Sequence, residues 1–316
     1  MTEKPLPAGS VRPWKFTGIL DGVFRILRVR LWSVWAICAA FLGVGTFFFH
    51  FSLGQAETAQ PMGVAPDPYA PPETSLVLVF LSFVIYGLSF LFLHPLAVAS
   101  VTEVARRHLR RGEATGIREA FRLVGRYGGS VLMTMILKWV LMIACLAVPV
   151  LIFLFSGLLL GAVTGDWASA MGGVAVLAVL CSLGLLSFLY CRLFLAVPVI
   201  LEENTPYWPA LKRSWQLTRS AFWRTFGLLL VLGLILYVFN LVPSLLQMLR
   251  LPLEFFLPPG TRWISNLLLS AMVAAFTSLV YAAPPILAVV LYYERRFRKE
   301  GWDLAAEAEH LRRETA

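Results

Sequence analysis

Long apolar stretches alternate with short polar ones along the whole chain. A helix of about 20 consecutive apolar residues is long enough to cross the hydrocarbon core of a bilayer. Six stretches meet that length, at about residues 31–53, 75–101, 130–158, 170–201, 222–247 and 263–293. The pattern therefore predicts an all-α integral membrane protein with six transmembrane helices, in a single membrane domain that covers residues 1–316.

Basic residues are concentrated in alternate connections between these stretches. Of 27 Lys and Arg residues, 23 lie in the segments at residues 1–30, 102–129, 202–224 and 294–316. The other three connections hold only Arg250 and Arg262. Because cytoplasmic segments carry the excess of Lys and Arg, we expect a protein of a prokaryotic cytoplasmic membrane with both termini in the cytoplasm. The same distribution accounts for the net charge of +9 without a nucleic-acid partner.

A basic segment with apolar residues at helical spacing precedes each odd-numbered span. The apolar stripes are Ile19, Val23, Ile26 and Leu27; Ile117, Ala120, Phe121 and Val124; and Trp208, Leu211, Trp215 and Phe222. Each even-numbered span ends with a proline and then a carboxylate, at Pro95 and Glu103, Pro198 and Glu202, and Pro285 and Glu294. The sequence therefore predicts three repeats of an amphipathic helix plus a transmembrane hairpin, at about residues 15–112, 113–204 and 205–300, followed by a cytoplasmic tail at 301–316.

The predicted amphipathic helices have two interpretations. A basic amphipathic helix beside a membrane most naturally lies in the interface, with its apolar face in the acyl boundary and its arginines against anionic headgroups. The alternative is that these segments only cover one end of the bundle and set its topology.

The connections on the predicted outer side differ in kind. Residues 55–74 contain five prolines and three acids, which predicts an extended, solvated segment. Residues 248–262 are apolar and rich in proline, and we expect them to lie on the outer membrane surface, with a substrate lid as the alternative. The connection between the third and fourth spans is short, so those two helices are expected to be antiparallel neighbours.

Residue types that support catalysis or metal binding are not arranged for it. The four histidines, His50, His94, His108 and His310, include no pair at metal-ligand spacing. The four cysteines lie in apolar stretches, also without such spacing. No Asp or Glu falls inside a predicted span, although proton-coupled pumps and cation channels usually carry acids there. We expect no catalytic site, no metal site and no cofactor.

Two cations fall inside predicted spans. At 1.5 Å per helical residue, Lys138 lies roughly 12 Å and Arg192 roughly 14 Å from the cytoplasmic end. A cation in hydrocarbon costs about 2.5–3.5 kcal/mol on insertion scales, so it needs a partner or a water path. One hypothesis is that both line an inward-facing cavity for an anion such as a lipid phosphate; the other is that each extends towards the headgroups. With the basic segments they give the candidate anion or lipid contacts Lys138, Arg192, Arg122, Arg126, Lys212, Arg213 and Arg219.

Two segments in the C-terminal third carry a family resemblance. One begins Leu-Glu-Glu at 201 and ends Ala-Leu-Lys-Arg-Ser-Trp-Gln-Leu-Thr-Arg at 210–219; the other is Tyr-Tyr-Glu-Arg-Arg-Phe-Arg-Lys-Glu-Gly-Trp-Asp-Leu at 292–304. The chain resembles the glycerophosphoryl diester phosphodiesterase membrane-domain family, most strongly over 195–304. That family takes its name from members fused to a soluble catalytic domain, whose histidine and carboxylate metal ligands have no counterpart here. The resemblance implies a multi-span membrane module and not hydrolysis of phosphodiesters.

Three functions follow from these observations. The favoured interpretation is a non-enzymatic membrane module that scaffolds membrane protein partners or interacts with anionic phospholipid. An alternative is a transporter or channel for an anionic or amphipathic solute, which Lys138 and Arg192 favour. The third is an accessory membrane component linked to glycerophosphodiester or lipid metabolism, which the family name suggests.

Overall fold

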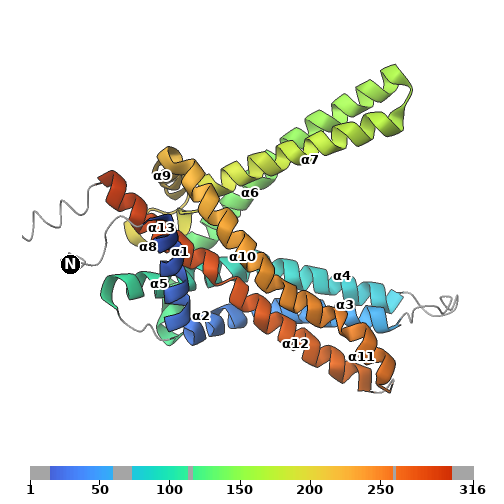
Figure 1. Cartoon of the computed structure of the whole chain (residues 1–316), viewed down its shortest axis with the longest axis horizontal. Coiled ribbons are helices and arrows are strands. Elements are labelled where there is room, and N and C mark those ends of the chain that lie inside the picture. The colour runs from blue at the N-terminus through green and yellow to red at the C-terminus, as the bar shows by residue number, and fades with distance from the viewer. Residues whose placement is uncertain (1–14, 60–72, 113–116, 259–260, 301–316) are drawn as a thin grey trace, which may run out of the picture.

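The computed structural model describes residues 15–59, 73–112, 117–258 and 261–300. In these ranges every regular element is a helix and no strand occurs (Figure 1). Six helical segments are long and apolar enough to cross a membrane: Leu31–Gln55, Val77–Arg110, Gly125–Thr164, Gly172–Glu203, Trp208–Met248 and Arg262–Lys299. They overlap the six predicted stretches in order, so the prediction of six spans is confirmed and the protein is a multi-pass membrane protein.

Most of the spans are built from more than one helix. The first comprises α2 (Leu31–Cys38), the π-helical segment η1 (Ala39–Gly43) and α3 (Val44–Ala59). The second comprises α4 (Glu73–Leu88), the π-helical segment η2 (Ser89–Leu93) and α5 (His94–Arg111). The third is the continuous α6 (Ile117–Thr164), and the fourth is α7 (Trp167–Arg192) with α8 (Ala196–Glu203). The fifth comprises α9 (Trp208–Thr218), the 3₁₀ turn η3 (Arg219–Ala221) and α10 (Phe222–Met248), and the sixth comprises α12 (Arg262–Val280) and α13 (Ala283–Glu300). Helix α1 (Phe16–Val29) precedes the first span, and α11 (Arg250–Phe256) connects the last two.

Each even-numbered span changes its helical geometry just before a proline. The changes are at η2 before Pro95, at residues 193–195 before Pro198, and at residues 281–282 before Pro285. Proline lacks the backbone N–H that an interior helical position needs, whereas the first turn of a helix accommodates it. Each proline therefore lies in the first turn of a new helix, which carries the predicted carboxylate. The threefold repeat itself stays a prediction.

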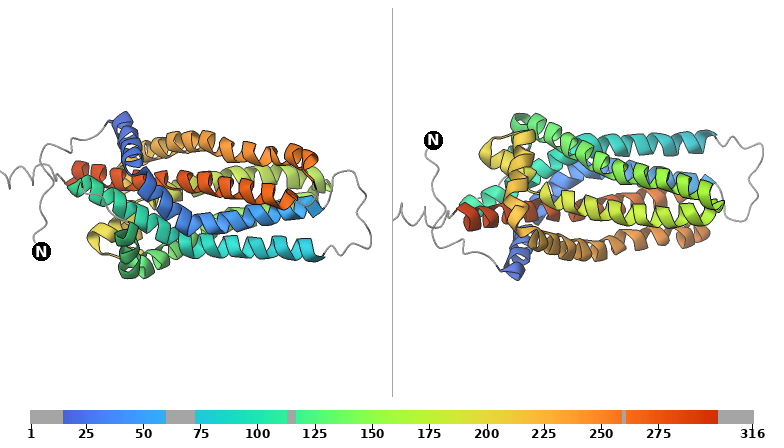
Figure 2. Two further views of the ribbon diagram at one scale, coloured as in Figure 1. Left: turned by 90° about the horizontal axis from the view of Figure 1, so that it is seen from below. Right: turned by 90° about the horizontal axis from the view of Figure 1, so that it is seen from above.

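The helices form two arms that meet at one end of the molecule. Helices α6 and α7 pack against each other and diverge from the arm that contains α3, α4, α10 and α12 (Figure 1). Helices α1, α8 and α9 lie at the end where the arms meet, and all long helices extend from there in one direction (Figure 2). We call this the basic end, because Arg106, Arg110, Arg213, Arg224 and Arg295 lie there, and the opposite end the far end.

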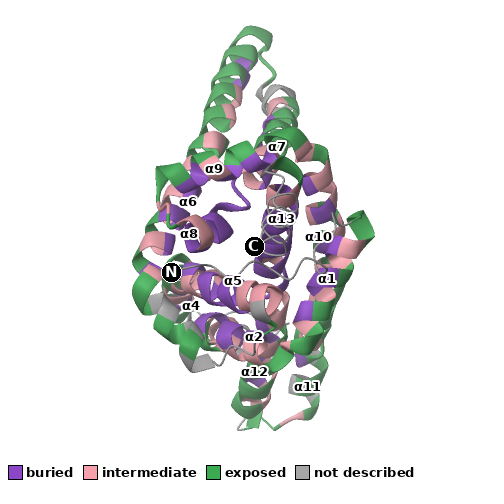
Figure 3. Ribbon diagram, turned by 90° about the vertical axis from the view of Figure 1, so that its left-hand side faces the viewer, coloured by how far each residue is buried: buried purple, intermediate pink, exposed green. Residues whose placement is uncertain are grey.

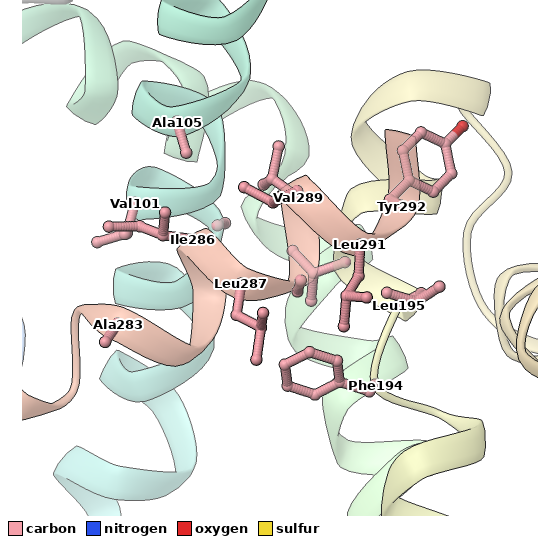
Figure 4. Packing of buried hydrophobic residues seen from close by; sticks show 14 of the residues in the cluster. Val101, Ala105, Phe194, Leu195, Ala283, Ile286, Leu287, Val289, Leu291 and Tyr292 are labelled. Carbon is pink, nitrogen blue, oxygen red and sulfur yellow. The ribbon is translucent and has the colours of Figure 1, made fainter. Parts of the chain in front are cut away.

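The core is centred on α13. Its residues Ala283, Ile286, Leu287 and Leu291 are fully buried, and the helix packs against α1, α5, α8 and α9. Figure 4 shows Val101 and Ala105 of α5 on one side of α13 and Phe194 and Leu195 on the other. The first half of α13, residues 283–291, is apolar on all sides, which is typical of a buried helical segment. Figure 3 shows the contrast with the α6–α7 arm, which is mostly exposed beyond its base.

The apolar face of α1 is covered by protein. Ile19, Val23 and Ile26 are at most 1% exposed and belong to the same apolar cluster as α13. The expectation that this face sinks into the acyl boundary is therefore wrong for α1. Burial against α13 removes the same apolar surface from water, so the apolar stripe alone does not distinguish the two environments.

The second basic segment is not a separate helix. It forms the start of α6, which runs without interruption for 48 residues. At 1.5 Å per residue α6 is about 72 Å long, far more than the hydrocarbon thickness of about 30 Å. The prediction of an independent surface helix at this position is wrong, because no residue near Gly128 and Gly129 ends the helix.

The third basic segment forms the separate helix α9, but its buried face differs from the predicted stripe. The buried residues are Ala210, Leu211, Ser214, Leu217 and Thr218. Trp208 and Trp215 are 58% and 37% exposed, so of the predicted α9 stripe only Leu211 is buried. The buried face differs because the hydroxyl side chains of Ser214 and Thr218 point towards the break between α7 and α8.

The far-end connections depart from the predicted outer loops. Residues 55–59 and 73–74 are helical, and the rest of the proline-rich segment lies outside the described residues, as does the tail at 301–316. Arg250 at the start of α11 is 8% exposed and covers Gly54, where an added Cβ would lie 1.2 Å from Arg250 Nη2. The start of the 248–262 segment therefore packs on the bundle, whereas Leu253 and Phe256 are exposed.

Candidate functional site

Four buried or half-buried carboxylates organise the basic end. Glu103 of α5 is fully buried and pairs with two arginines of its own helix. Its carboxylate oxygens lie 2.6 Å from Arg106 Nε and 2.6 Å from Arg107 Nε. Such charge-assisted hydrogen bonds at i+3 and i+4 compensate the cost of burying the charge.

Glu202 and Glu203 of α8 connect that helix to its neighbours. Glu202 Oε2 lies 3.2 Å from Arg110 Nη1 of α5, and Tyr293 of α13 donates its hydroxyl hydrogen bond to Oε1. Glu203 accepts a hydrogen bond of 3.0 Å from Arg213 of α9 and one of 3.0 Å from the Tyr292 hydroxyl. Two adjacent carboxylates therefore join α5, α8, α9 and α13.

Glu294 of α13 is the fourth of these carboxylates. It is 3% exposed, and its Oε1 lies 2.8 Å from Arg224 Nη1 of α10 and accepts a further bond from Arg298. The proline-to-carboxylate pattern of the even spans located Glu103, Glu202 and Glu294. It gave no signal for Arg224, Tyr292 or Tyr293, whose partners are distant in the sequence.

The break between α7 and α8 is completed by α9. Ser214 Oγ donates to the Arg192 carbonyl at 2.8 Å and accepts a hydrogen bond from the Leu195 N–H at 3.1 Å. Thr218 Oγ1 donates to the same carbonyl at 3.3 Å. Backbone groups released by a helix break must find other partners when they are buried, so α9 is fixed beside Arg192.

Arg192 lies among three aromatic rings. Its Cζ atom is 4.9 Å from the ring centre of Phe188, 5.2 Å from that of Trp215 and 5.6 Å from that of Phe222. These distances are within the range of cation–π attraction. Its Nε and Nη1 atoms are buried without a hydrogen-bond partner among the described residues. The rings hold the guanidinium in place, and two of its donors are left unused by the described residues.

Lys138 lies in a different environment. It is 7% exposed, and its Nζ is 4.6 Å from the ring centre of Tyr190. His94 is close enough to interact electrostatically with it, and the His94 ring stacks on Phe90. No carboxylate of the described residues pairs with Lys138. It is a buried cation held by aromatic groups of α5 and α7.

The structure does not bring Lys138 and Arg192 into one cavity. Lys138 contacts Tyr190, which is two residues from Arg192 on α7. Two residues correspond to about 200° around a helix of 3.6 residues per turn. The two cations therefore lie on opposite sides of α7. Their contacts do not form the common inward-facing cavity.

The other candidate contacts divide into two groups. Arg213 pairs with Glu203 and is part of the internal network. Arg122, Arg126, Lys212 and Arg219 are exposed, and no ion pair joins them to a described carboxylate. The Cζ atom of Arg126 lies 5.4 Å from the centre of the Tyr127 ring. The exposed group faces the surroundings of the basic end.

A cavity of about 290 Å³ lies between α7 and α10, close to Arg192. It is lined by Leu183, Gly184 and Ser187 of α7 and by Phe222, Trp223 and Phe226 of α10. No group of three His, Cys, Asp or Glu in the described ranges is placed to hold a metal ion. The chemistry of this region is therefore that of an apolar groove beside cations.

Comparison with known proteins gives a family match. A family model described as a domain of unknown function, DUF7847, matches residues 33–295. No curated protein and no solved structure matches the chain. The resemblance to the glycerophosphoryl diester phosphodiesterase membrane domain stays a prediction, because the matching family has no assigned activity.

Proposed function

Because the chain belongs to the DUF7847 family, which carries no assigned function, we propose a function from the geometry of the basic end. The protein is a non-enzymatic membrane module that binds anionic phospholipid there. The basic end faces the cytoplasm, as the distribution of Lys and Arg indicates.

The observation that carries this proposal is a division of the basic residues into two layers. The inner layer forms ion pairs with Glu202 and Glu203. It includes Arg106, Arg110 and Arg213. The outer layer consists of four exposed cations that pair with no described carboxylate: Arg122, Arg126, Lys212 and Arg219. An anionic leaflet attracts such residues by about 1 kcal/mol each.

The test is the composition of the lipid that surrounds the protein. The wild-type chain is extracted with its lipid shell by a copolymer, and the ratio of phosphatidylglycerol to phosphatidylethanolamine in the shell is compared with that of the whole membrane. We expect enrichment of the anionic lipid for the wild type. It falls to the membrane average when Arg122, Arg126, Lys212 and Arg219 are all replaced by Gln.

The matched control keeps the charges. Replacing the three arginines by Lys and Lys212 by Arg retains four positive charges at the same exposed positions, so we expect the enrichment to persist. Equal enrichment in the Gln and charge-retaining variants would show that the outer layer does not select lipid, and the proposal would be withdrawn.

A transporter of amphipathic anions is the second candidate, and one observation favours it. The π-helical segments η1 and η2 contact each other within the first two spans, where Ser89 Oγ lies 3.5 Å from the Phe41 carbonyl. Segments of π-helix occur frequently at functional sites, and His94, which interacts with Lys138, directly follows η2. Transfer of fluorescent phosphatidylglycerol across proteoliposomes, lost in Lys138→Gln, would support it. Absence of transfer by the wild type removes it.

Two further roles rest on the sequence alone. Scaffolding of membrane protein partners and an accessory role in lipid metabolism stay predictions. Stable recovery of one membrane protein after crosslinking in native membranes would favour the first.

A further inference from the structure

We propose that one anionic phospholipid binds between α7 and α10, with its phosphate against Arg192, Arg219 and Lys299 and one acyl chain in the α7–α10 cavity. This inference rests on the proposed function and assigns it a discrete site. It is carried by three features that meet at the base of the α6–α7 arm.

The first feature is the cavity. Its volume of about 290 Å³ is near the lower end of the range of ligand pockets, about 300–1,000 Å³. Leu183 is 56% exposed and Trp223 is 79% exposed, so the cavity is a groove that opens on the outer face of the two helices. In a bilayer that face meets acyl chains. A chain that enters sideways buries apolar surface against Phe222 and Phe226.

The second feature is an excess of cations at the mouth of this groove. Lys299 interacts electrostatically with Arg192, Arg213, Arg219 and Arg295. Arg213 and Arg295 are paired with Glu203 and Glu294. Among the described residues Arg192, Arg219 and Lys299 have no carboxylate partner, and Lys299 donates only to the Gln216 carbonyl. A phosphate relieves the repulsion among these three charges.

The third feature is the connection between the two. Phe222 lines the groove and also lies 5.6 Å from Arg192 Cζ, while Ser187 of the groove adjoins Phe188 of the same aromatic set. Unpaired donors and an apolar groove therefore lie one side chain apart. A free phosphate would fill only the cationic part. The two parts together match a molecule that carries a phosphate and an acyl chain.

The test is photocrosslinking with phosphatidylglycerol that carries a diazirine in its acyl chain. Proteoliposomes of the full chain are irradiated and the modified peptides are identified. We expect crosslinks at residues 183–187 and 222–226. Gly184→Leu adds an apolar side chain at the wall of the groove, where a Cβ meets nothing within 4 Å. It should reduce the crosslink yield about tenfold, the effect of losing roughly 1.4 kcal/mol of binding.

Two controls make the result specific. Gly173→Leu places the same side chain on α7 at a position that also meets nothing within 4 Å but lies outside the groove. It should leave the yield unchanged. Arg192→Gln should also lower the yield about tenfold, because it removes the positive charge and the donors that would bind the phosphate.

The remaining outcomes separate the two proposals. If Gly184→Leu and Gly173→Leu crosslink as the wild type does, the site is rejected, although anionic enrichment that depends on the four exposed cations would still support the proposed function. If crosslinking at the groove responds to Gly184→Leu while enrichment ignores those cations, the site holds and the wider function fails. Displacement of the crosslink by inorganic phosphate at millimolar concentration would show that the occupant is a free anion and would overturn the lipid assignment.

Discussion

Arg110 Nη1 lies 3.2 Å from Glu202 Oε2 and so joins two helices whose contacting residues are 92 positions apart in the sequence. The same carboxylate accepts a hydrogen bond from Tyr293 and lies 3.6 Å from Arg106. One side chain therefore holds α5, α8 and α13 together at the basic end, with a side-chain exposure of 4%.

Replacing Glu202 by Gln is expected to destabilise the fold strongly. It removes the carboxylate charge that lies 3.2 Å from Arg110, whereas Arg106 keeps its pair with Glu103. Removal of one partner from a buried ion pair costs about 3–5 kcal/mol. Thermal unfolding in detergent measures the effect. Glu119→Gln is the control, because the Glu119 side chain is 51% exposed in its pair with Arg107 and such pairs contribute about 0–1 kcal/mol. Equal losses in both variants would contradict the structural role of Glu202.

Gly45→Ala is expected to disturb the contact between the first two spans. A Cβ at Gly45 would lie 2.5 Å from Ser89 Oγ and 2.6 Å from Ser89 Cβ, so η2 must move away. Overpacking of this kind costs about 1–3 kcal/mol. Gly87→Ala on α4 meets nothing within 4 Å and should be neutral or stabilising by up to about 1 kcal/mol. The double variant Gly45→Ala with Ser89→Gly should recover part of the loss in unfolding midpoint.

Ser214→Ala is expected to loosen the break between α7 and α8. It removes a hydrogen bond of 2.8 Å to the Arg192 carbonyl and one of 3.1 Å from the Leu195 N–H. Leaving such groups unsatisfied in the interior costs about 1–3 kcal/mol. Ser220→Ala changes an exposed hydroxyl nearby and should stay within about 0.5 kcal/mol. Hydrogen exchange at residues 193–195 reads the local effect, and unchanged exchange would argue against this role of Ser214.

The six spans were predictable because each is a continuous apolar stretch, whereas the site depends on contacts between distant residues. Proline spacing located Glu103, Glu202 and Glu294 but not their partners, since Tyr293 reaches Glu202 across 91 residues. The predicted apolar stripe of α9 was wrong because Ser214 and Thr218 face inwards and donate hydrogen bonds to the Arg192 carbonyl. A hydropathy pattern does not indicate such hydrogen bonds. Tyr207 adopts a φ of 65°, a left-handed conformation that side chains other than Gly rarely take, and no local pattern indicated it.

Lys138→Met is expected to leave the unfolding midpoint unchanged or raised. The cation–π contact with Tyr190 contributes about 0.5–2 kcal/mol, which is less than the roughly 2.5–3.5 kcal/mol cost of placing the charge in hydrocarbon. Lys212→Met, at an exposed position, should have an effect within about 0.5 kcal/mol. A clear drop for Lys138→Met alone would show that a bound anion or water path stabilises the charge.

Cysteine labelling tests the predicted orientation. In a variant that lacks the natural thiols Cys38, Cys145, Cys181 and Cys191, a single cysteine is introduced by Ser220→Cys at the basic end or Thr261→Cys at the far end. Both positions are exposed. A membrane-impermeant maleimide added to intact cells should label the Thr261→Cys variant. The Ser220→Cys variant should react only after the membrane is opened, and the reverse pattern would invert the topology.

The divergence of the two arms gives the protein a wedge-shaped cross-section. The helices occupy a small area where the arms meet and a larger one at the far end, so the two leaflets are displaced unequally (Figure 1). A change of lateral pressure in the far leaflet is therefore expected to change the angle between the α6–α7 arm and its neighbour. The groove between α7 and α10 lies at the base of this angle, so membrane curvature and lipid shape are expected to change how far it opens.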